Sequence, residues 1–357
     1  MRRAFALIAA ALPLGAAAQD RSITVISWGG DFSAAQVEAL NRPFTAETGI
    51  GVLMVDAGDP ALPLKAQAEA GNVTTDVASI GYAEATQLCD AGVVQPIDHA
   101  ILTPAPDGTP LEQDFMPHAL AECFVATDIY STVIAWDDRA MDGAVPQTVA
   151  DFFDLERFPG RRGVLKEPRF TLEMALMADG VPAAQVYELL STDAGVDRAF
   201  AKLDTIKAQS IFWEAGAQPR QLLADGEVAM AMAYNGRIFA ARVDDDVPVS
   251  MMWDGQIYEI EGWVIPTDAP NPAEALEYVA YTTSPQVMAR FAGQISYGLP
   301  RHSAAALVGN YRDTDMPMAG HLPTAPENMS NALQFDHDFW GDHLNELNER
   351  FARWVAS

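Results

Sequence analysis

The sequence predicts an α/β protein of two lobes, each built on a doubly wound sheet, with a cleft between them. Three observations support this. A chain of 357 residues, 49% of them hydrophobic, can fill two cores rather than one. Short apolar strands alternate with helices in both halves of the chain, as in parallel sheets. The long extended run at 123–136 exceeds one ordinary strand and suits a crossing between lobes.

The first 18 residues have the composition of a secretory signal peptide. Two arginines precede an apolar centre, and the segment ends in Ala16-Ala17-Ala18, which fits a signal-peptidase site. We expect the mature chain to begin at Gln19 and to be exported. The alternative, an uncleaved membrane anchor, needs a longer apolar span.

The first lobe is organised around ITVISWGGDFSAAQ, residues 23–36. Its opening β-branched run predicts a buried parallel strand, and Trp28 stands where that strand ends. Gly29 and Gly30 permit a tight turn, and Asp31 is predicted to cap the following helix. Ligands of open α/β sheets bind beyond the carboxyl ends of strands, so topology places Trp28 at a candidate site. A packing residue over the turn is the alternative.

Strands and helices continue to alternate through residue 92. After the first helix ends near Gly49, the pattern predicts strands at 52–55 and 76–80 and helices at 64–70 and 83–90. Gly81 and Tyr82 follow the second of these strands, at the same level as Trp28. Tyr82 is therefore a second candidate site residue.

The alternation restarts at residue 149. The pattern predicts helices at 149–153, 171–179, 193–207 and 219–224 and strands at 163–165 and 227–234. The last strand ends in Tyr234-Asn235-Gly236, again an aromatic residue and a glycine at a carboxyl end. Helices over 270–292 and 339–354 complete the chain.

A strand pair at 249–253 and 257–265, with a turn at Asp254-Gly255, is predicted to lead out of the second lobe. Glu259 and Glu261 point to one face of it, with Cα atoms roughly 6.6 Å apart. Two carboxylates at that spacing repel unless a positive group lies between them or water screens them. A solvent-exposed face is the alternative, but the flanking Tyr258 and Trp263 favour a site.

The two cysteines, Cys89 and Cys123, are predicted to form one disulfide, because export places them in an oxidising compartment. The chain-entropy model gives about 3 kcal/mol of stabilisation for a loop of ~35 residues. The alternative is a catalytic thiol. Neither cysteine has the neighbouring histidine or helix start that would activate it.

Composition and missing motifs exclude several classes of function. The net charge of −27 repels phosphate backbones, so nucleic acid is not an expected partner. The sequence contains no G-x-S-x-G, P-loop, G-x-G-x-x-G or H-E-x-x-H motif. His337 and His343, six residues apart, do not share a helix face, so no metal site is expected. We expect a binding protein without cofactor or catalytic residues.

The order of several segments resembles the periplasmic solute-binding proteins of the spermidine/putrescine type, the extracellular components of ABC importers. The resemblance covers residues 22–357 and rests on SWGG at 27, TDVASIGYAEATQLCDAGVVQPID at 75, YSTVIAWD at 130, PGRRGVLKEP at 159, LLADGEVAMAMAYNGR at 222, GQIYEIEGWVIP at 255, SYGLP at 296 and LPTAPEN at 322.

This resemblance implies a type II periplasmic-binding-protein fold with one ligand in the cleft. The expected lobes are residues 19–130 plus 262–300 and residues 131–261 plus 301–357. It also implies a periplasmic, monomeric protein whose partners are a small amine ligand and an ABC permease in the inner membrane.

Polyamine binders hold methylenes between aromatic walls and ammonium groups on carboxylates. Carried over by position and joined to the candidates above, the expected ligand-binding residues are Trp28, Tyr82, Tyr234, Glu259, Glu261 and Tyr297, with Trp213 and Glu167 as weaker members. For Trp213 and Tyr297, ordinary core packing is the alternative.

The sequence departs from the polyamine pattern in three places. Phe170 stands where those proteins carry a second acid, and Glu259 replaces an aromatic residue. Arg169, Arg220 and Arg237 lie in candidate cleft segments, and the sequence does not place them inside or outside the cleft. An arginine inside would suit a carboxylate.

The expected function is capture of a polyamine for an importer. The alternative ligand is a small zwitterionic or quaternary amine such as 4-aminobutyrate. An alternative of another class is an exported enzyme of the same fold with a cysteine nucleophile. An iron-binding relative would carry adjacent cleft tyrosines, which are not seen.

Overall fold

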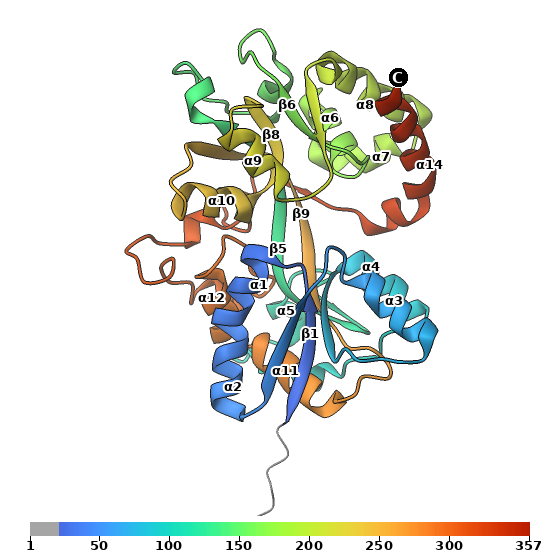
Figure 1. Cartoon of the computed structure of the whole chain (residues 1–357), viewed down its shortest axis with the longest axis vertical. Coiled ribbons are helices and arrows are strands. Elements are labelled where there is room, and N and C mark those ends of the chain that lie inside the picture. The colour runs from blue at the N-terminus through green and yellow to red at the C-terminus, as the bar shows by residue number, and fades with distance from the viewer. Residues whose placement is uncertain (1–20) are drawn as a thin grey trace, which may run out of the picture.

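The computed structural model describes residues 21–357, so the predicted signal peptide and the start at Gln19 lie outside the described residues. Two lobes lie one above the other, and the long strands β5 (Phe124–Asp137) and β9 (Val249–Val264) run between them (Figure 1). This arrangement confirms the predicted two-lobed α/β fold. Within residues 21–357 no helix is both long and apolar enough to cross a bilayer.

The main strands form one sheet in the order β2-β1-β3-β9-β5-β8-β6-β7. In one half, β1 (Ser22–Ser27) pairs in parallel with β2 (Gly51–Asp56) and β3 (Val77–Gly81). In the other half, β6 (Arg162–Leu165) pairs in parallel with β7 (Ser210–Trp213) and β8 (Met230–Tyr234). The antiparallel pair of β5 and β9 joins the halves. Two short strands add to the sheet: β4 (Leu120–Ala121) pairs with β5, and β10 (Leu333–Gln334) pairs with β9.

The carboxyl ends of strands from both halves meet at this central pair. Gly81, the last residue of β3, lies opposite Glu261 of β9. Tyr234, the last residue of β8, lies opposite Thr132 of β5. Because ligands of parallel sheets bind at this edge, the register brings the two predicted binding edges together.

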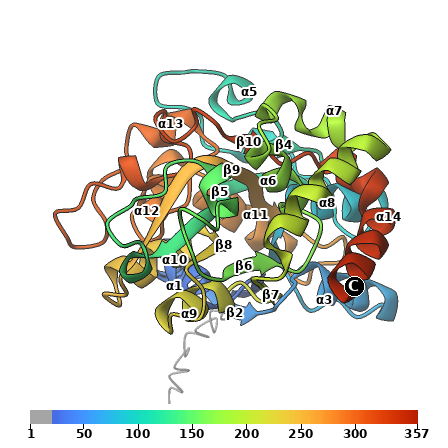
Figure 2. The ribbon, with the colours of Figure 1, turned by 90° about the horizontal axis from the view of Figure 1, so that it is seen from above.

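Helices cover both faces of the strands. Seen from above, α8 and α14 lie on one side of the second-lobe strands and α10 on the other (Figure 2). The helices are α1 (Gly30–Gln36), α2 (Arg42–Thr48), α3 (Ala61–Ala70), α4 (Tyr82–Asp90), α5 (Leu111–Asp114), α6 (Thr171–Ala178), α7 (Val186–Leu190), α8 (Asp193–Lys207), α9 (Gln218–Ala224), α10 (Asn235–Val243), α11 (Pro272–Thr282), α12 (Pro285–Ala292), α13 (His302–Ala305) and α14 (His337–Ala356). A π-helical segment, Val37–Asn41, joins α1 to α2.

Two large hydrophobic cores correspond to the two lobes. The first takes side chains from Ile23 to Ile129 and from Tyr258 to Leu322. The second takes side chains between Ile134 and Ile257 and from Leu333 to Phe351. The sequence placed all of 301–357 in the second lobe. Instead, Ala304, Tyr311, Met318 and Leu322 pack in the first core, because that segment folds back against it before α14 begins.

Local structure differs from the sequence expectation in two further places. The predicted turn at Asp254-Gly255 is absent. Instead β9 runs through these residues as one strand, and it pairs with β5 both before and after them. The positive φ of Gly255 falls in an irregularity of that pairing. Asp31 does not cap α1. Gly29 is the capping residue, with a φ of 77°, and Asp31 lies in the first turn.

The predicted disulfide is present. Cys89, near the end of α4, is bonded to Cys123, just before β5. The bond therefore ties a helix of the first lobe to the start of a connecting strand. Both cysteines of the chain are used in it, so the thiol that a cysteine nucleophile needs is absent.

Candidate binding site between the lobes

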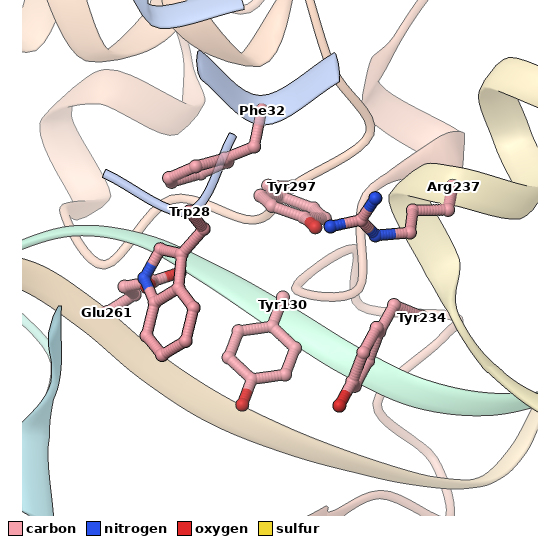
Figure 3. Close-up of a pocket in the computed structure, with 7 residues that line it drawn as sticks. All are labelled: Trp28, Phe32, Tyr130, Tyr234, Arg237, Glu261 and Tyr297. Carbon is pink, nitrogen blue, oxygen red and sulfur yellow. The ribbon is translucent and has the colours of Figure 1, made fainter. Parts of the chain in front are cut away.

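A pocket lies where the strand ends of both lobes meet β5 and β9. About 440 Å³ of space between its lining residues is not filled by atoms, and this space includes part of the opening to solvent. Its lining is mostly aromatic, with one acid and one base (Figure 3), and consists of Trp28, Phe32, Tyr130, Tyr234, Arg237, Glu261 and Tyr297. Because both lobes contribute, the pocket belongs to the cleft between them.

Aromatic rings form a continuous wall of the pocket. The Tyr130 ring lies edge to face with Tyr234, with centroids 5.5 Å apart, and 6.3 Å from the Tyr297 ring. The Tyr297 ring in turn lies 5.5 Å from Phe32. Tyr297 packs directly on the backbone of Gly236, where any β-carbon would overlap its ring. Such faces attract cations and cover methylene groups.

Trp28 follows β1 and stands at the turn that the glycines make. The φ of 77° at Gly29 favours glycine and turns the chain sharply into α1. The indole Nε1 of Trp28 is buried, and within residues 21–357 it has no hydrogen-bond partner. The site thus holds an unused donor as well as an aromatic surface.

Two glutamates of β9 project to the face that carries the pocket. Glu259 lies opposite Tyr130 of β5 and accepts a hydrogen bond from its hydroxyl. Glu261 lines the pocket, and no described residue hydrogen-bonds or pairs with its carboxyl group. Burial raises the pKa of Glu259 to about 8, with a further contribution from Glu84. Burial, and then Asp128 and Glu259, raise the pKa of Glu261 well above its usual value.

Arg237 supplies the positive charge of the pocket. It sits in the first turn of α10, whose first residue, Asn235, accepts a hydrogen bond from the Ser131 backbone N–H at 2.9 Å and donates to the Ser296 carbonyl. These bonds fix the start of α10 to β5 and to the loop of Tyr297. In the described part of the chain no acid lies within ion-pair distance of the Arg237 guanidinium. Figure 3 shows Arg237 and Glu261 on opposite sides of the pocket, with Tyr130 and Tyr297 between them.

The other two arginines are engaged elsewhere. Arg169 pairs with Glu167 at 3.0 Å and reaches Glu84 of the other lobe at 3.6 Å. Arg220 pairs with Asp245 and lies 3.9 Å from Asp31. The sequence did not show which of the three arginines faces the cleft. In the structure Arg237 lines the pocket, whereas Arg169 and Arg220 do not.

A wider compartment adjoins the pocket and shares Trp28 and Tyr234 with it. Charged residues of both lobes line it, with acids in excess of bases: Asp59, Glu84, Glu167 and Glu214 against Lys166 and Arg169. Glu167, predicted as a weaker site residue, is found here rather than in the pocket.

Four of the predicted ligand-binding residues line one pocket: Trp28, Tyr234, Glu261 and Tyr297. Glu259 lies beside it, held by Tyr130. The structure does not bring Tyr82 and Trp213 into the pocket lining. The Tyr82 ring packs on Phe124 at 5.7 Å and lines a separate cavity with His118 and His337. Trp213 is 1% exposed in the second core and supports Tyr234 from behind at 5.9 Å.

Sequence reasoning missed Phe32, Tyr130 and the buried Asp128. Asp128 and Tyr130 are two residues apart in β5 and lie opposite Glu261 and Glu259, so both face the same side of the sheet as Glu261. The available signal for Asp128 was an acid in the middle of a long strand that is mostly apolar at both ends. Phe32 gave no such signal, because an aromatic residue in a first helical turn usually packs in a core.

The model of the family described as bacterial extracellular solute-binding protein matches residues 39–324. The chain belongs to this family. The match spans both lobes and the strands that connect them.

Relatives agree with this assignment. The chain is 40% identical over 350 residues to the gamma-aminobutyric acid-binding protein of Pseudomonas aeruginosa, covering 98% of this chain and 95% of the relative. It is 25% identical over 313 residues to the spermidine/putrescine-binding periplasmic protein of Salmonella typhimurium, covering 85% of each. The structure of an ABC transporter substrate-binding protein from Bradyrhizobium japonicum USDA 110 is similar, with a TM-score of 0.82, 29% identity and coverage of 94% and 99%.

The family and these relatives are binding proteins rather than enzymes, so this chain is a solute-binding protein of an ABC transporter. Membership implies a small ligand and a permease partner. Within residues 21–357 no group of three or more His, Cys, Asp or Glu is arranged to hold a metal ion.

Proposed function

We propose that this chain captures a small zwitterionic amine of the 4-aminobutyrate kind in the periplasm and delivers it to an ABC permease. The observation that carries the proposal is the pair of unpartnered, opposite charges in one pocket. Glu261 and Arg237 both line it, and neither has a charged partner among the described residues. Glu261 is buried and Arg237 is half-buried, and a buried acid without a partner is costly, so a ligand that pairs with both groups is stabilised there.

Each part of 4-aminobutyrate has a complementary group in the pocket. The guanidinium of Arg237 can bind the ligand carboxylate through two parallel hydrogen bonds. Glu261 can accept hydrogen bonds from the ammonium group, which the aromatic faces also attract. The methylenes between the two charges fit the wall of Tyr130 and Tyr297.

Three observations favour the zwitterion over the polyamine that the sequence suggested first. A polyamine would bring further positive charge close to Arg237, which repels it, and would offer the guanidinium no carboxylate. The relative named for gamma-aminobutyric acid is 40% identical to the chain, against 25% for the spermidine/putrescine-binding one. Phe170, where polyamine binders have an acid, packs on Phe335 at 4.9 Å and adds no charge.

Capture requires no chemistry. A ligand that contacts Glu261 on β9 and Arg237 on α10 binds the closed arrangement of the lobes better than an open one and so shifts the population toward closure. The closed, monomeric form then docks on the permease.

A thermal-shift panel tests the ligand class. The mature protein, residues 19–357, is melted with 4-aminobutyrate, putrescine, spermidine or choline. A ligand present at 100 times its dissociation constant adds about 2.7 kcal/mol to the free energy of unfolding. We expect this shift with 4-aminobutyrate and a smaller one or none with the diamine. A shift with putrescine or spermidine but none with 4-aminobutyrate would show that the proposed ligand is wrong.

A further inference from the structure

A bulge in β5 places one buried acid directly opposite another. Ala126 lies opposite Gly262, and regular pairing would then set Thr127 against Glu261. Instead the register shifts by one residue, and Asp128 is the partner of Glu261. Bulges re-aim side chains and are common beside functional sites. Side chains opposite each other in an antiparallel pair point to one face, with Cβ atoms about 5 Å apart.

Neither carboxyl group has a compensating charge. Asp128 is fully buried and Glu261 is 5% exposed. Asp128 accepts one hydrogen bond, from the Thr127 hydroxyl at 2.7 Å, while its Oδ1 has no partner among residues 21–357. Two buried carboxylates facing each other cannot both remain ionised without a cation between them.

The surrounding groups do not supply that cation. The titratable and charged groups that act on the pair from the packed elements are Glu259 and Glu84, the hydroxyls of Tyr130 and Tyr297, and the guanidinium of Arg237. Acids outnumber bases in this set. Arg237 is the one cation in this set. It lies on the opposite side of the pocket from Glu261, where the proposed ligand carboxylate binds (Figure 3).

We propose that Asp128 and Glu261 share one proton in the empty cleft and release it when the ligand ammonium binds, so that amine capture is coupled to proton release. This inference rests on the proposed function and deepens it. Asp128 acts as a positioning residue, because it does not line the pocket and affects the ligand through Glu261.

The charges balance in this exchange. In the empty cleft the pair holds one proton and carries one negative charge. An alkylammonium with a pKa near ~10 stays protonated on binding. The O–H bond of the shared proton breaks, the proton leaves to buffer, and the pair then carries two negative charges beside the new positive charge. The ammonium, which contacts Glu261, thus replaces the proton as the positive charge that offsets the second carboxylate.

The direction of the pH dependence follows from this exchange. Burial raises the pKa of Asp128, and burial together with the facing Asp128 raises the pKa of Glu261 well above its usual value, so the empty pair holds its proton at neutral pH. The ligand binds the form that has lost the proton. The affinity for the ligand therefore rises with pH. Below the pKa of the pair it rises by up to about tenfold per pH unit. It becomes constant at a pH where both carboxyl groups of the empty protein are already ionised.

Calorimetry of the mature wild-type protein with 4-aminobutyrate tests the coupling. Titrations are run at several pH values between 6 and 9, each in two buffers of different ionisation enthalpy. The difference in measured heat between buffers gives the number of protons released. We expect about one proton per ligand at the acidic end and fewer as pH rises. Binding with no dependence on the buffer at any of these pH values would overturn the inference.

Three variants identify the source of the proton. Asp128→Asn removes one carboxyl group of the pair and should abolish proton release and flatten the rise of affinity with pH. Glu173→Gln is the matched control, since Glu173 is a buried acid with a pKa raised to about 7, hydrogen-bonded to Trp340 in the second core and absent from the pocket. It should release the same number of protons as the wild type. Loss of proton release in Glu259→Gln, with release retained in Asp128→Asn, would overturn the assignment.

The two proposals fail in different ways. Ligand binding without proton release contradicts the coupling alone and leaves the ligand assignment intact. No heat and no thermal shift with 4-aminobutyrate at any pH contradicts the ligand assignment and, with it, the coupling. A melt of each variant without ligand establishes that it is folded before its proton count is compared.

Discussion

Arg237→Ala is expected to weaken 4-aminobutyrate binding by ~100-fold, because the charged hydrogen bonds to the ligand carboxylate contribute about 3 kcal/mol. Arg237 has no acid partner among the described residues, so its removal should leave the empty protein as stable as the wild type or more so. Calorimetry measures the affinity, and a melt of the empty protein measures the stability.

Two further arginine variants make this result specific. Arg237→Lys keeps the charge but loses the planar two-bond geometry, so it should recover only part of the affinity. Arg220→Ala is the matched control, because Arg220 is paired with Asp245 and does not line the pocket. If the Arg237→Ala variant bound 4-aminobutyrate as the wild type does, the carboxylate site would have to lie elsewhere.

Glu261→Gln is expected to reduce 4-aminobutyrate affinity by ~10- to 100-fold when measured at pH 8 or above, where the wild-type pair ionises most readily. The neutral amide keeps the shape of the side chain but loses the charged hydrogen bond to the ammonium, about 1.5–3 kcal/mol. Equilibrium dialysis with labelled ligand measures the loss.

The control for this change is Glu214→Gln. Glu214 is an exposed acid of the adjoining compartment, paired with Lys166 at 2.5 Å, so its replacement should leave affinity within about twofold. Equal effects of the two substitutions would indicate that the ammonium is attracted by the general negative field of the cleft and not held by Glu261.

Much of the site could be predicted because strand ends are readable in the sequence. Trp28 and Tyr234 each end an apolar run and have a glycine within the next two residues, and parallel topology places both at the ligand edge. Glu261 could be predicted because a charged residue in an apolar strand requires an explanation. For these residues a local pattern and a general rule of sheet topology were sufficient.

The remaining residues depend on packing between segments that are distant in the sequence. Trp213 also ends a strand, but its ring turns into the second core, and nothing local indicates the direction. Tyr82 begins α4, but its ring packs on Phe124 and lines a separate cavity. Arg237 enters the pocket because Asn235 is held by Ser131 and Ser296, contacts across more than 60 residues. Asp128 faces Glu261 only because β5 contains a bulge.

The pairing of one ligand with both Glu261 and Arg237 is tested most directly by comparing 4-aminobutyrate with two analogues that each lack one charge. Butylamine keeps the ammonium and lacks the carboxylate, and butyrate keeps the carboxylate and lacks the ammonium. Calorimetry of the wild-type protein should show each analogue binding at least ~100-fold more weakly than 4-aminobutyrate, because each lacks one of the two charged contacts. Butylamine binding as tightly as 4-aminobutyrate would contradict the assignment of Arg237, and butyrate doing so would contradict that of Glu261.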